Sequence, residues 1–322
     1  MKRHFEDPFR FCVNYAYEIL ASKKEGFPLT YFYELLGRMT DRPWDVIDRL
    51  QFLGLSEISE DLILQRKGEH DISSGSIPRL NGRYYYYPEC SSTMDVAAGL
   101  ASVGALDFTV VVAESQGGGR GRNGRQWVSS PGGIYCSIIL RPDIAPGLSF
   151  RVNFMVCAVL ASLLRGVYGV DAFCKWPNDI LAGGGKLAGI ISDSVIEGAT
   201  VKYVIIGLGI NVNNALPEVD QPVSSVRSIL GKEVARKKFF DNFLLRLHEA
   251  YSELSSRDWI SETRAYSATI GRKVTIERPG GVLSGEAIGV DEFGLLLVRT
   301  GGGDIISVAS GDCIHSYCDI SI

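Results

Sequence analysis

Residues 117–127, GGGRGRNGRQW, place Arg120, Arg122 and Arg125 within six residues that contain no acidic side chain. Guanidinium groups bind phosphate and carboxylate oxygens in pairs. The glycines between them let backbone N–H groups come close to an anion. A solvated surface loop or a Gly-Arg segment that binds nucleic acid has a similar composition. Because this segment is single and lies between two predicted strands, we interpret it as an anion-binding loop of an active site.

The same loop matches G-x-G-x-x-G through Gly119, Gly121 and Gly124, which is the pattern of dinucleotide-binding folds. That pattern needs a helix directly after the glycines, because the pyrophosphate rests on the helix N-terminus. Here RQWVSSPGGIYCS follows, with a proline, two glycines and no helical periodicity. The context therefore argues against a dinucleotide site, and the missing G-K-[ST] ending argues against a P-loop.

A second group of charged residues lies in KWPNDILAGGGKLAG, residues 175–189. Lys175, Asn178, Asp179 and Lys186 fall at the ends and turn of a predicted hairpin. Such a hairpin would bring two ammonium groups and a carboxylate near one another. A hairpin with an exposed charged tip is an equally good explanation of this segment alone.

The elements around these motifs divide the chain into three parts. Three short helices and a small hairpin are predicted at the start, which is the order of a winged helix, over residues 12–24, 29–36, 44–53 and 55–67. A polar stretch, residues 67–82, follows as a linker. From Gly271 onward, four short strands separated by turns predict a small β-barrel, over 273–277, 284–291, 295–300 and 304–309.

The middle part alternates strands and helices in an α+β pattern. A helix with its N-cap among Ser91, Ser92 and Thr93 follows the first strand. A second helix is apolar on most sides and is therefore expected in the core, and a third is amphipathic, over 150–168 and 236–256. Strands are predicted at 84–90, 107–115, 134–142, 174–182, 186–196 and 203–212, with Gly183 to Gly185 joining the fourth to the fifth.

Composition narrows the class of protein. The 322 residues are 46% hydrophobic and 22% charged, with a formal charge of −4, so only a local cluster could bind a polyanion. The longest apolar stretch, residues 154–164, has eleven residues including one serine, too short to span a bilayer, and we expect no signal sequence in the charged start. We expect a cytoplasmic protein that does not enter a membrane. The seven cysteines form no C-x-x-C pair, and we predict no metal site held by the protein.

Together these segments resemble the biotin protein ligase family, including its bacterial form that is also the biotin operon repressor. The matching motifs are SST at 91–93, AESQGGGRGRNGRQW at 113–127, KWPND at 175–179, GKLAGI at 185–190 and GLGINVNN at 207–214. The resemblance implies a class II synthetase-like biotin/lipoate ligase catalytic domain, a winged-helix-like module at the N-terminus and an SH3-like β-barrel at the C-terminus. The implied boundaries are 1–80 for the module and linker, 81–268 for the catalytic domain and 269–322 for the barrel.

The family reaction has two halves. Biotin and Mg·ATP form biotinyl-5′-AMP, and a lysine of a biotin carboxyl carrier domain then attacks the mixed anhydride. The resemblance thus implies a biotin–[acetyl-CoA-carboxylase] ligase that uses ATP and Mg²⁺, with the carrier domain as partner. The alternatives are a biotin-responsive DNA-binding repressor, alone or combined with ligase activity, and a lipoate or octanoate ligase of the same fold.

The family also implies roles for individual residues. Biotin contacts are implied for Ser92, Thr93, Met94, Gln116, Arg120, Gly121, Arg122 and Lys186. ATP contacts are implied for Arg122, Arg125, Trp127, Lys175, Asn178 and Asn211. The catalytic set is Arg120, Lys186 and Asp179, with Asp179 a candidate to orient or deprotonate the acceptor lysine. The chain departs from the family at Met94, where asparagine is usual, and it lacks a tryptophan after GLGINVNN that could stack on adenine.

The N-terminal part gives conflicting signals about DNA. Residues 1–70 contain ten Lys and Arg against twelve Asp and Glu. The expected recognition helix, 41–52, carries three acids and two bases, and DNA affinity depends on neutralising phosphates. Charge therefore argues against strong operator binding, whereas the order of elements favours it. A module that serves the carrier interface or a homodimer is an equally good explanation.

Overall fold

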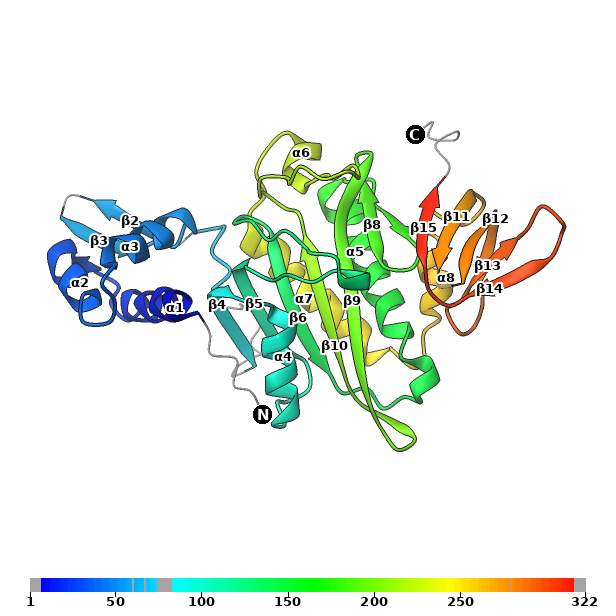
Figure 1. Cartoon of the computed structure of the whole chain (residues 1–322), viewed down its shortest axis with the longest axis horizontal. Helices are drawn as coiled ribbons and strands as arrows, with labels where there is room; N and C mark the ends of the chain where they lie inside the picture. Colours follow the sequence, from blue (N-terminus) through cyan, green and yellow to red (C-terminus); the bar gives the residue numbers. More distant parts are fainter. Residues whose placement is uncertain (1–6, 60, 67, 74–82, 279, 316–322) are drawn as a thin grey trace. The chain divides into compact units, whose positions relative to one another are not determined.

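The computed structural model describes residues 7–59, 61–66, 68–73, 83–278 and 280–315 (Figure 1). These residues form two compact units. Unit 1 comprises the described residues of 1–140, 205–217 and 225–241, and unit 2 those of 141–204, 218–224 and 242–322. Each unit is described by itself below.

Unit 1 begins with three helices and a three-stranded sheet, shown in blue in Figure 1. The helices are α1 (Pro8–Ala21), α2 (Leu29–Leu36) and α3 (Pro43–Phe52), and the strands pair in the order β1 (Phe27–Pro28), β3 (Leu62–Gln65), β2 (Ser56–Ser59). The predicted helices and hairpin are confirmed, except that α1 begins four residues early. Asp7 explains the earlier start, because its carboxylate accepts the N–H of Phe9 and so caps the helix.

A mixed seven-stranded sheet forms the middle of the chain. Its order is β4 (Tyr84–Cys90), β5 (Thr109–Gln116), β6 (Ile134–Leu140), β10 (Thr200–Ile210), β9 (Gly185–Glu197), β8 (Asp179–Ala182), β7 (Phe173–Lys175). Strands β4 and β5 are parallel and are joined by α4 (Thr93–Ser102), whose N-cap is Ser92 as predicted. Strands β5 and β6 are antiparallel. The sheet is therefore of the predicted α+β type.

One predicted strand is wrong. The segment 174–182 folds as two short strands, β7 and β8, which run antiparallel with Lys175 opposite Asp179. Residues 176–178 form the turn between them. Pro177 has no N–H to donate to a ladder, so a continuous strand through it is disfavoured. The segment from Lys175 to Lys186, called the charged hairpin below, therefore contains two consecutive turns.

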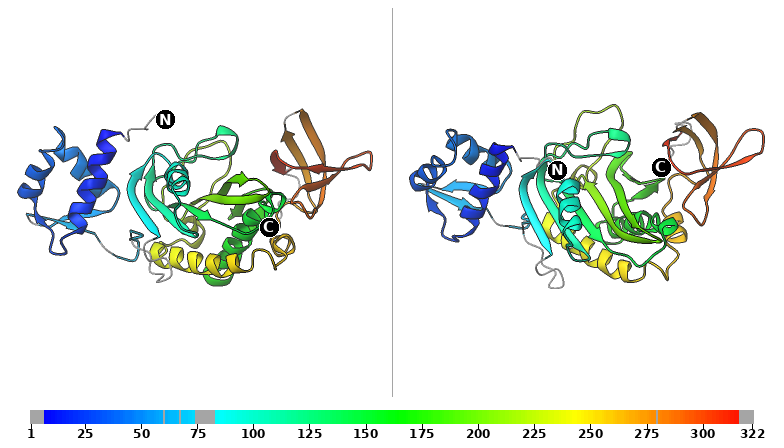
Figure 2. Two further views of the ribbon diagram at one scale, coloured as in Figure 1. Left: turned by 90° about the horizontal axis from the view of Figure 1, so that it is seen from below. Right: turned by 60° about the horizontal axis from the view of Figure 1, so that its bottom comes forward.

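The long helices pack against the strands within their units. In unit 2, α5 (Arg151–Tyr168) is long and apolar enough to cross a membrane, but eleven of its residues are buried in the protein, so it is a core helix. The first part of α7 (Arg236–Ser252), yellow in Figure 2, belongs to unit 1, where Phe240 packs on Tyr84 of β4. Two short helices, α6 (Val226–Leu230) and α8 (Trp259–Arg264), had no predicted counterpart.

The C-terminal part of unit 2 is an antiparallel five-stranded sheet. Its order is β14 (Ile305–Val308), β13 (Leu296–Arg299), β12 (Gly281–Val290), β11 (Lys273–Arg278), β15 (Asp312–His315). The four predicted strands are present. The fifth, β15, was not predicted; it pairs with β11.

Candidate functional site

The arginine loop, residues 117–127, begins where β5 ends at Gln116. Its backbone folds back on itself: the N–H of Gly121 donates to the carbonyl of Arg125 at 2.7 Å, and that of Trp127 donates to Gly119 at 2.9 Å. At its start, Gly118 donates to the carbonyl of Ser91 at 2.8 Å. The loop is therefore attached both to strand β5 and to the turn that precedes α4.

Close packing explains one of the loop glycines. A Cβ on Gly119 would lie 2.5 Å from the carbonyl oxygen of Trp127 and 2.9 Å from Oγ of Ser129. Real Cβ atoms do not approach so closely, so any other residue here would displace the returning strand of the loop. Gly119 is needed for the fold of the loop itself, whatever the loop binds.

A cluster of hydroxyl and amide groups, Ser92, Thr93, Gln116 and Ser137, lies beside the start of the loop. Oε1 of Gln116 accepts both the N–H of Thr93 at 2.8 Å and its hydroxyl at 3.1 Å. Ser137 donates to the Thr93 hydroxyl at 2.8 Å. Oγ of Ser92 is buried without a hydrogen-bond partner among the described residues. A buried hydroxyl normally finds a partner, so this cluster has capacity for a polar ligand.

The neighbouring Met94 is buried and apolar. Its thioether is only a weak acceptor, so this position offers no strong polar side-chain contact. The asparagine usual at this position has no polar replacement here.

Arg120 of the arginine loop is held by an exposed ion pair. Arg120 Nη2 lies 2.7 Å from Oδ1 of Asp95, and the two side chains are 48% and 51% exposed. Arg125 is exposed, and its Nε donates to the carbonyl of Arg122 at 3.4 Å. Exposed ion pairs contribute roughly 0–1 kcal/mol. An anion can therefore compete with Asp95 for the guanidinium group of Arg120 at little cost.

Trp127 and Asn211, both predicted to contact ATP, lie in unit 1 and contact different residues. The indole of Trp127 rests on Gly209 of β10, where any side chain would collide with the ring. Asn211 is buried; its Oδ1 accepts from Nδ2 of Asn214 at 3.1 Å. Gly209, the second glycine of GLGINVNN, is therefore required by its packing against Trp127.

Unit 2 fixes the charged hairpin far more tightly. Lys186 Nζ lies 2.8 Å from Oδ1 of Asp179, with side chains only 19% and 18% exposed. The backbone of Lys186 is clamped on both sides, since its N–H donates to Pro222 at 2.9 Å and its carbonyl accepts from Ser224 at 3.1 Å. A Cβ on Gly185 would lie 2.7 Å from the carbonyl carbon of Val223, so glycine is required there.

Asn178 and Lys175 complete the hairpin. Nδ2 of Asn178 donates to the carbonyl of Ile190 at 2.5 Å, and the N–H of Ile190 donates back to Asn178 at 2.9 Å. This reciprocal pair holds the turn onto β9. Lys175 is half-buried at the end of β7, opposite Asp179.

The five-stranded sheet supports the same hairpin within unit 2. The N–H of Trp176 donates to Oγ1 of Thr269 at 3.0 Å, and that hydroxyl lies 3.1 Å from Nε2 of His315. Burial, together with the positive charges of Lys175 and Arg272, lowers the pKa of His315 to about 4. The imidazole is therefore neutral near pH 7.

Sequence reasoning missed the buried ion pair that supports unit 1. Arg236 Nη1 lies 2.5 Å from Oε1 of Glu114, its Nη2 lies 2.9 Å from Oε2, and both residues are buried. The arginine also donates to the carbonyls of Gly133 and His70. The acid directly after the apolar run VVVA was the available signal, because a buried carboxylate needs a charged partner.

Two segments of the chain match known families. Residues 88–211 match the biotin/lipoate A/B protein ligase family, and residues 269–316 match the biotin protein ligase C-terminal domain. The bifunctional ligase/repressor BirA of Bacillus subtilis is 32% identical over 244 residues, which cover 73% of this chain and 75% of that protein. The chain belongs to the biotin protein ligase family.

Further relatives and structures support membership in the biotin protein ligase family. The biotin–[acetyl-CoA-carboxylase] ligase of Mycobacterium tuberculosis is 32% identical over 70% of this chain and 85% of its own length. The biotin protein ligase from Aquifex aeolicus, solved with biotin and ATP, has a TM-score of 0.62 at 25% identity and covers 73% of this chain and 98% of that one. The predicted ligase fold with a C-terminal domain is thereby confirmed.

Proposed function

We propose that this biotin protein ligase family member activates biotin with ATP to biotinyl-5′-AMP and transfers it to a lysine of a biotin carboxyl carrier domain. The observation that carries the proposal is the buried cluster at Ser92, Thr93 and Gln116, which keeps one hydroxyl without a partner inside the segment that matches the ligase family. One of the similar solved structures, the biotin protein ligase from Aquifex aeolicus, contains both biotin and ATP.

The cluster suits the ureido ring of biotin. That ring presents fixed N–H donors and a carbonyl acceptor, and hydroxyl and amide groups can serve both. We assign Ser92 as the direct partner, with Thr93 and Gln116 fixed in place by their mutual hydrogen bonds. Met94 would contribute only apolar packing, and Gly121 only its backbone.

The cations have a separate role. The first half of the reaction brings a carboxylate and a triphosphate together, and their repulsion must be offset. We assign Arg120, Arg122 and Lys186 to the biotin carboxylate and the reacting phosphate. We assign Arg125, Trp127, Lys175, Asn178 and Asn211 to the nucleotide.

Asp179 is proposed for the second half. A free lysine has a pKa of about 10.4, so the acceptor amine is mostly protonated near pH 7. Asp179 would orient that amine or take its proton. Its carboxylate is held by Lys186, so the two side chains must separate, or share the proton, during transfer.

Magnesium enters as part of the substrate. Among the described residues, no group of three or more His, Cys, Asp or Glu side chains could hold a metal ion. Mg²⁺ commonly binds through substrate phosphates and waters and needs no protein cage. We therefore propose Mg·ATP as the substrate form.

The remaining assignments concern the ends of the chain and its setting. We propose that residues 1–80 form a winged-helix-like module with its linker, that 81–268 form the catalytic domain and that 269–322 form an SH3-like barrel. Residues 74–82 of the linker lie outside the described residues. We propose a cytoplasmic enzyme that works as a monomer or homodimer.

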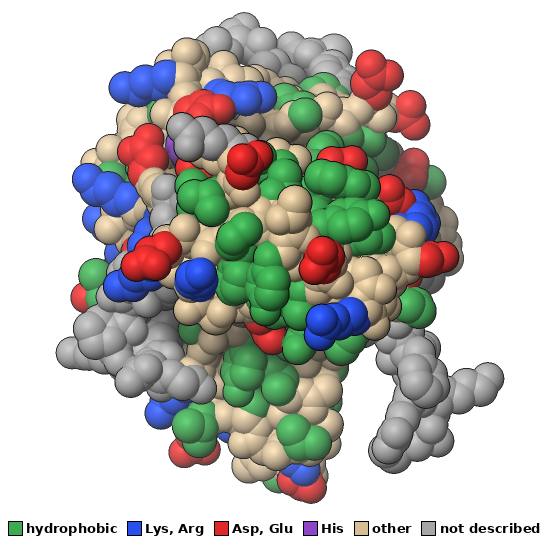
Figure 3. All heavy atoms as spheres, turned by 90° about the vertical axis from the view of Figure 1, so that its left-hand side faces the viewer, with side chains coloured by type: hydrophobic (Ala, Val, Ile, Leu, Met, Phe, Trp, Pro, Cys, Tyr) green, Lys and Arg blue, Asp and Glu red, His purple; other side chains and the backbone are tan. Residues whose placement is uncertain are grey.

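Operator binding is not favoured by the charges of the module. At the N-cap of α3, Arg42 pairs with Asp45. Within α3, Arg49 pairs with Glu89, whereas Asp48 is exposed. Figure 3 views the molecule from the side of this module; on the face shown, the blue side chains of the described residues are scattered among red and green ones. Salt-dependent binding to the DNA upstream of its own gene would show a repressor function.

Pyrophosphate exchange tests the ligase function directly. We expect the protein to exchange labelled pyrophosphate into ATP only when biotin is added. Lipoate and octanoate are the controls for the related ligases of the same fold. Exchange that depends on lipoate and not on biotin would overturn the proposal.

A further inference from the structure

One face of helix α1 contacts the strands that lead into the candidate biotin site. Arg10, Asn14 and Tyr17 are spaced at i, i+4 and i+7, so they lie on the same face of the helix. Nδ2 of Asn14 donates to the backbone carbonyl of Glu89 at 2.9 Å, and the N–H of Glu89 donates to Oδ1 of Asn14 at 3.0 Å. The ring of Tyr17 packs on that of Tyr86 in β4, with centroids 5.4 Å apart. These contacts lie within unit 1 and hold α1 beside β4.

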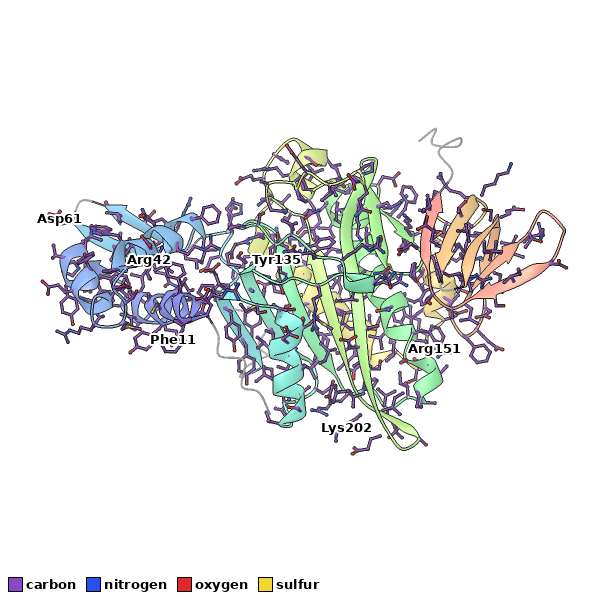
Figure 4. All side chains as sticks on the ribbon, in the orientation of Figure 1. Phe11, Arg42, Asp61, Tyr135, Arg151 and Lys202 are labelled. Atoms are coloured by element: carbon purple, nitrogen blue, oxygen red, sulfur yellow. The ribbon has the colours of Figure 1, made fainter. Side chains whose placement is uncertain are left out.

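Arg10 reaches the arginine loop itself. If Gly117 carried a Cβ, the three nearest atoms would be Nη2, Cζ and Nη1 of Arg10, with Cζ at 2.9 Å. The guanidinium group therefore occupies space that is open because the loop begins with a glycine. The next residue, Phe11, marks this turn of α1 in Figure 4. Helix α1 thus brings a fourth guanidinium group to a loop that already carries three arginines.

Arg10 differs from Arg49 of the same module in its partners. Arg49 pairs with Glu89, whereas no carboxylate among the described residues pairs with Arg10. Arg10 is half-buried, and its guanidinium group is a permanent cation with five N–H donors. Like charges repel, so a cation placed against an arginine-rich loop is favourable only when an anion occupies the site. The position of Arg10 therefore points to a bound anion at the loop.

We propose that Arg10 is a further cation of the anion-binding site formed by the arginine loop, and that the missing side chain at Gly117 is what admits it. The inference rests on the proposed function, in which this site receives the carboxylate of biotin and the triphosphate of ATP. Gly117 and Arg120 are three residues apart, and a chain of that length spans at most about 11 Å. Across such a distance the charge of Arg10 attracts the triphosphate through space, and salt weakens the attraction.

Arg10→Gln tests the charge, because glutamine is neutral and also carries hydrogen-bonding groups on a flexible chain. A unit charge about 10 Å from a polyanion near a protein surface changes its affinity on the order of fivefold, so we expect that rise in KM for Mg·ATP in biotin-dependent pyrophosphate exchange. The KM for biotin should rise less, because biotin carries a single negative charge, and kcat should change little. The difference from wild type should vanish at about 1 M salt, where the Debye length is about 3 Å. Arg10→Lys keeps the charge and should retain a KM close to that of the wild type.

Gly117→Ala tests the position of the same charge. The new Cβ must displace the guanidinium group, which is the end of a flexible side chain, so the fold should be retained. We expect KM for Mg·ATP to rise by a factor similar to that in Arg10→Gln. In the double variant the alanine meets no guanidinium group, so its KM should be no higher than that of either single variant. Such non-additivity is characteristic of residues in contact. Thermal unfolding of each variant checks that the fold is intact.

Arg38→Gln is the matched control. Arg38 is an exposed arginine directly after α2, a helix that packs on α3, β1 and β3. This substitution changes the net charge of the protein by the same amount as Arg10→Gln. It should leave KM for Mg·ATP at the wild-type value, which separates a local charge effect from an effect of net charge.

The outcomes separate the two proposals. If the wild-type protein shows no biotin-dependent exchange, the proposed function is wrong. If exchange is intact and Arg10→Gln has the KM of the Arg38→Gln control, Arg10 is not part of the anion-binding site and the inference is overturned. If Arg10→Lys shows the same raised KM as Arg10→Gln at every salt concentration, Arg10 acts by packing alone and the inference is likewise overturned.

Discussion

The arginine loop of unit 1 and the charged hairpin of unit 2 both carry cations, yet they hold them in opposite ways. Arg120 is half exposed, and its partner Asp95 is equally exposed. Lys186 is less than one-fifth exposed, and its backbone is fixed on both sides. A weakly held arginine can change partners when an anion arrives, whereas a clamped lysine offers a charge at a fixed place. The two regions thus differ as an exposed, exchangeable ion pair in one unit and a half-buried, fixed ion pair in the other.

We expect the largest effect on folding stability from the buried ion pair of Glu114 and Arg236 in unit 1. Arg236→Met leaves Glu114 buried without its charged partner, which typically costs about 3–5 kcal/mol of folding free energy. Urea or thermal unfolding measures this loss. The matched control is Arg257→Met, because Arg257 pairs with Glu253 and Glu262 at the surface. Equal losses of unfolding free energy for the two variants would show that the pair of Glu114 and Arg236 contributes no more than a surface ion pair.

A smaller effect is expected when the rigid pair of unit 2 is altered. Asp179→Asn keeps the shape of the side chain and removes its charge. General acid–base groups typically contribute about 10²–10⁴-fold, so we expect at least about a hundredfold slower transfer from preformed biotinyl-AMP to the carrier domain. Pyrophosphate exchange should be less affected. Transfer at the wild-type rate would remove Asp179 from the mechanism.

Folding stability should depend on pH through His315, whose ring contacts the Thr269 hydroxyl that accepts from Trp176 of the charged hairpin. The pKa of His315 is lowered to about 4 in the folded protein, against an ordinary value of about 6.5. The unfolded state therefore takes up the proton first, and folding stability is lost as the pH falls from about 6.5 to about 4. We expect a loss on the order of 1 kcal/mol, since partial exposure reduces the effect. His315→Asn should flatten this dependence in thermal unfolding; an unchanged pH profile would contradict it.

The smallest effect is expected on biotin affinity when the ion pair of the arginine loop is altered. Asp95→Asn removes the exposed partner of Arg120, a contact worth roughly 0–1 kcal/mol. Biotin affinity, measured by calorimetry, should change by no more than about threefold. A loss as large as that of an arginine-loop variant would mean that Asp95 positions Arg120, and that the loop is as rigid as the hairpin.

Sequence patterns predicted these regions unequally. The strands around the loop were predicted because buried apolar runs such as VVVAES are strong signals. The segment 174–182 was wrongly predicted as one strand, because the turn at residues 176–178 is only three residues long and lies between two short apolar stretches. The contact between Lys186 and Asp179 depends on a register shift between Ile180 and Leu181. Spacing alone does not specify such a shift.

Long-range partners were beyond the sequence for a related reason. Glu114 and Arg236 are 122 residues apart, so only the fold brings them together. The acidic residue in a buried strand indicated that a charged partner was needed, but not which residue it is. The reciprocal contact of Asn14 with the backbone of Glu89 had no such signal, because backbone groups carry no information in the sequence.

Biotin-dependent pyrophosphate exchange by Arg120→Ala and Lys186→Ala tests the central claim most directly. Arg299→Ala and Lys202→Ala are the controls, because each removes an exposed cation that pairs with a glutamate. Loss of preorganised charge stabilisation typically costs about 10²–10³-fold in rate. We predict that loss for both site variants, with KM for biotin raised most in Arg120→Ala, and wild-type exchange in both controls. Wild-type exchange in Arg120→Ala and Lys186→Ala would contradict the account.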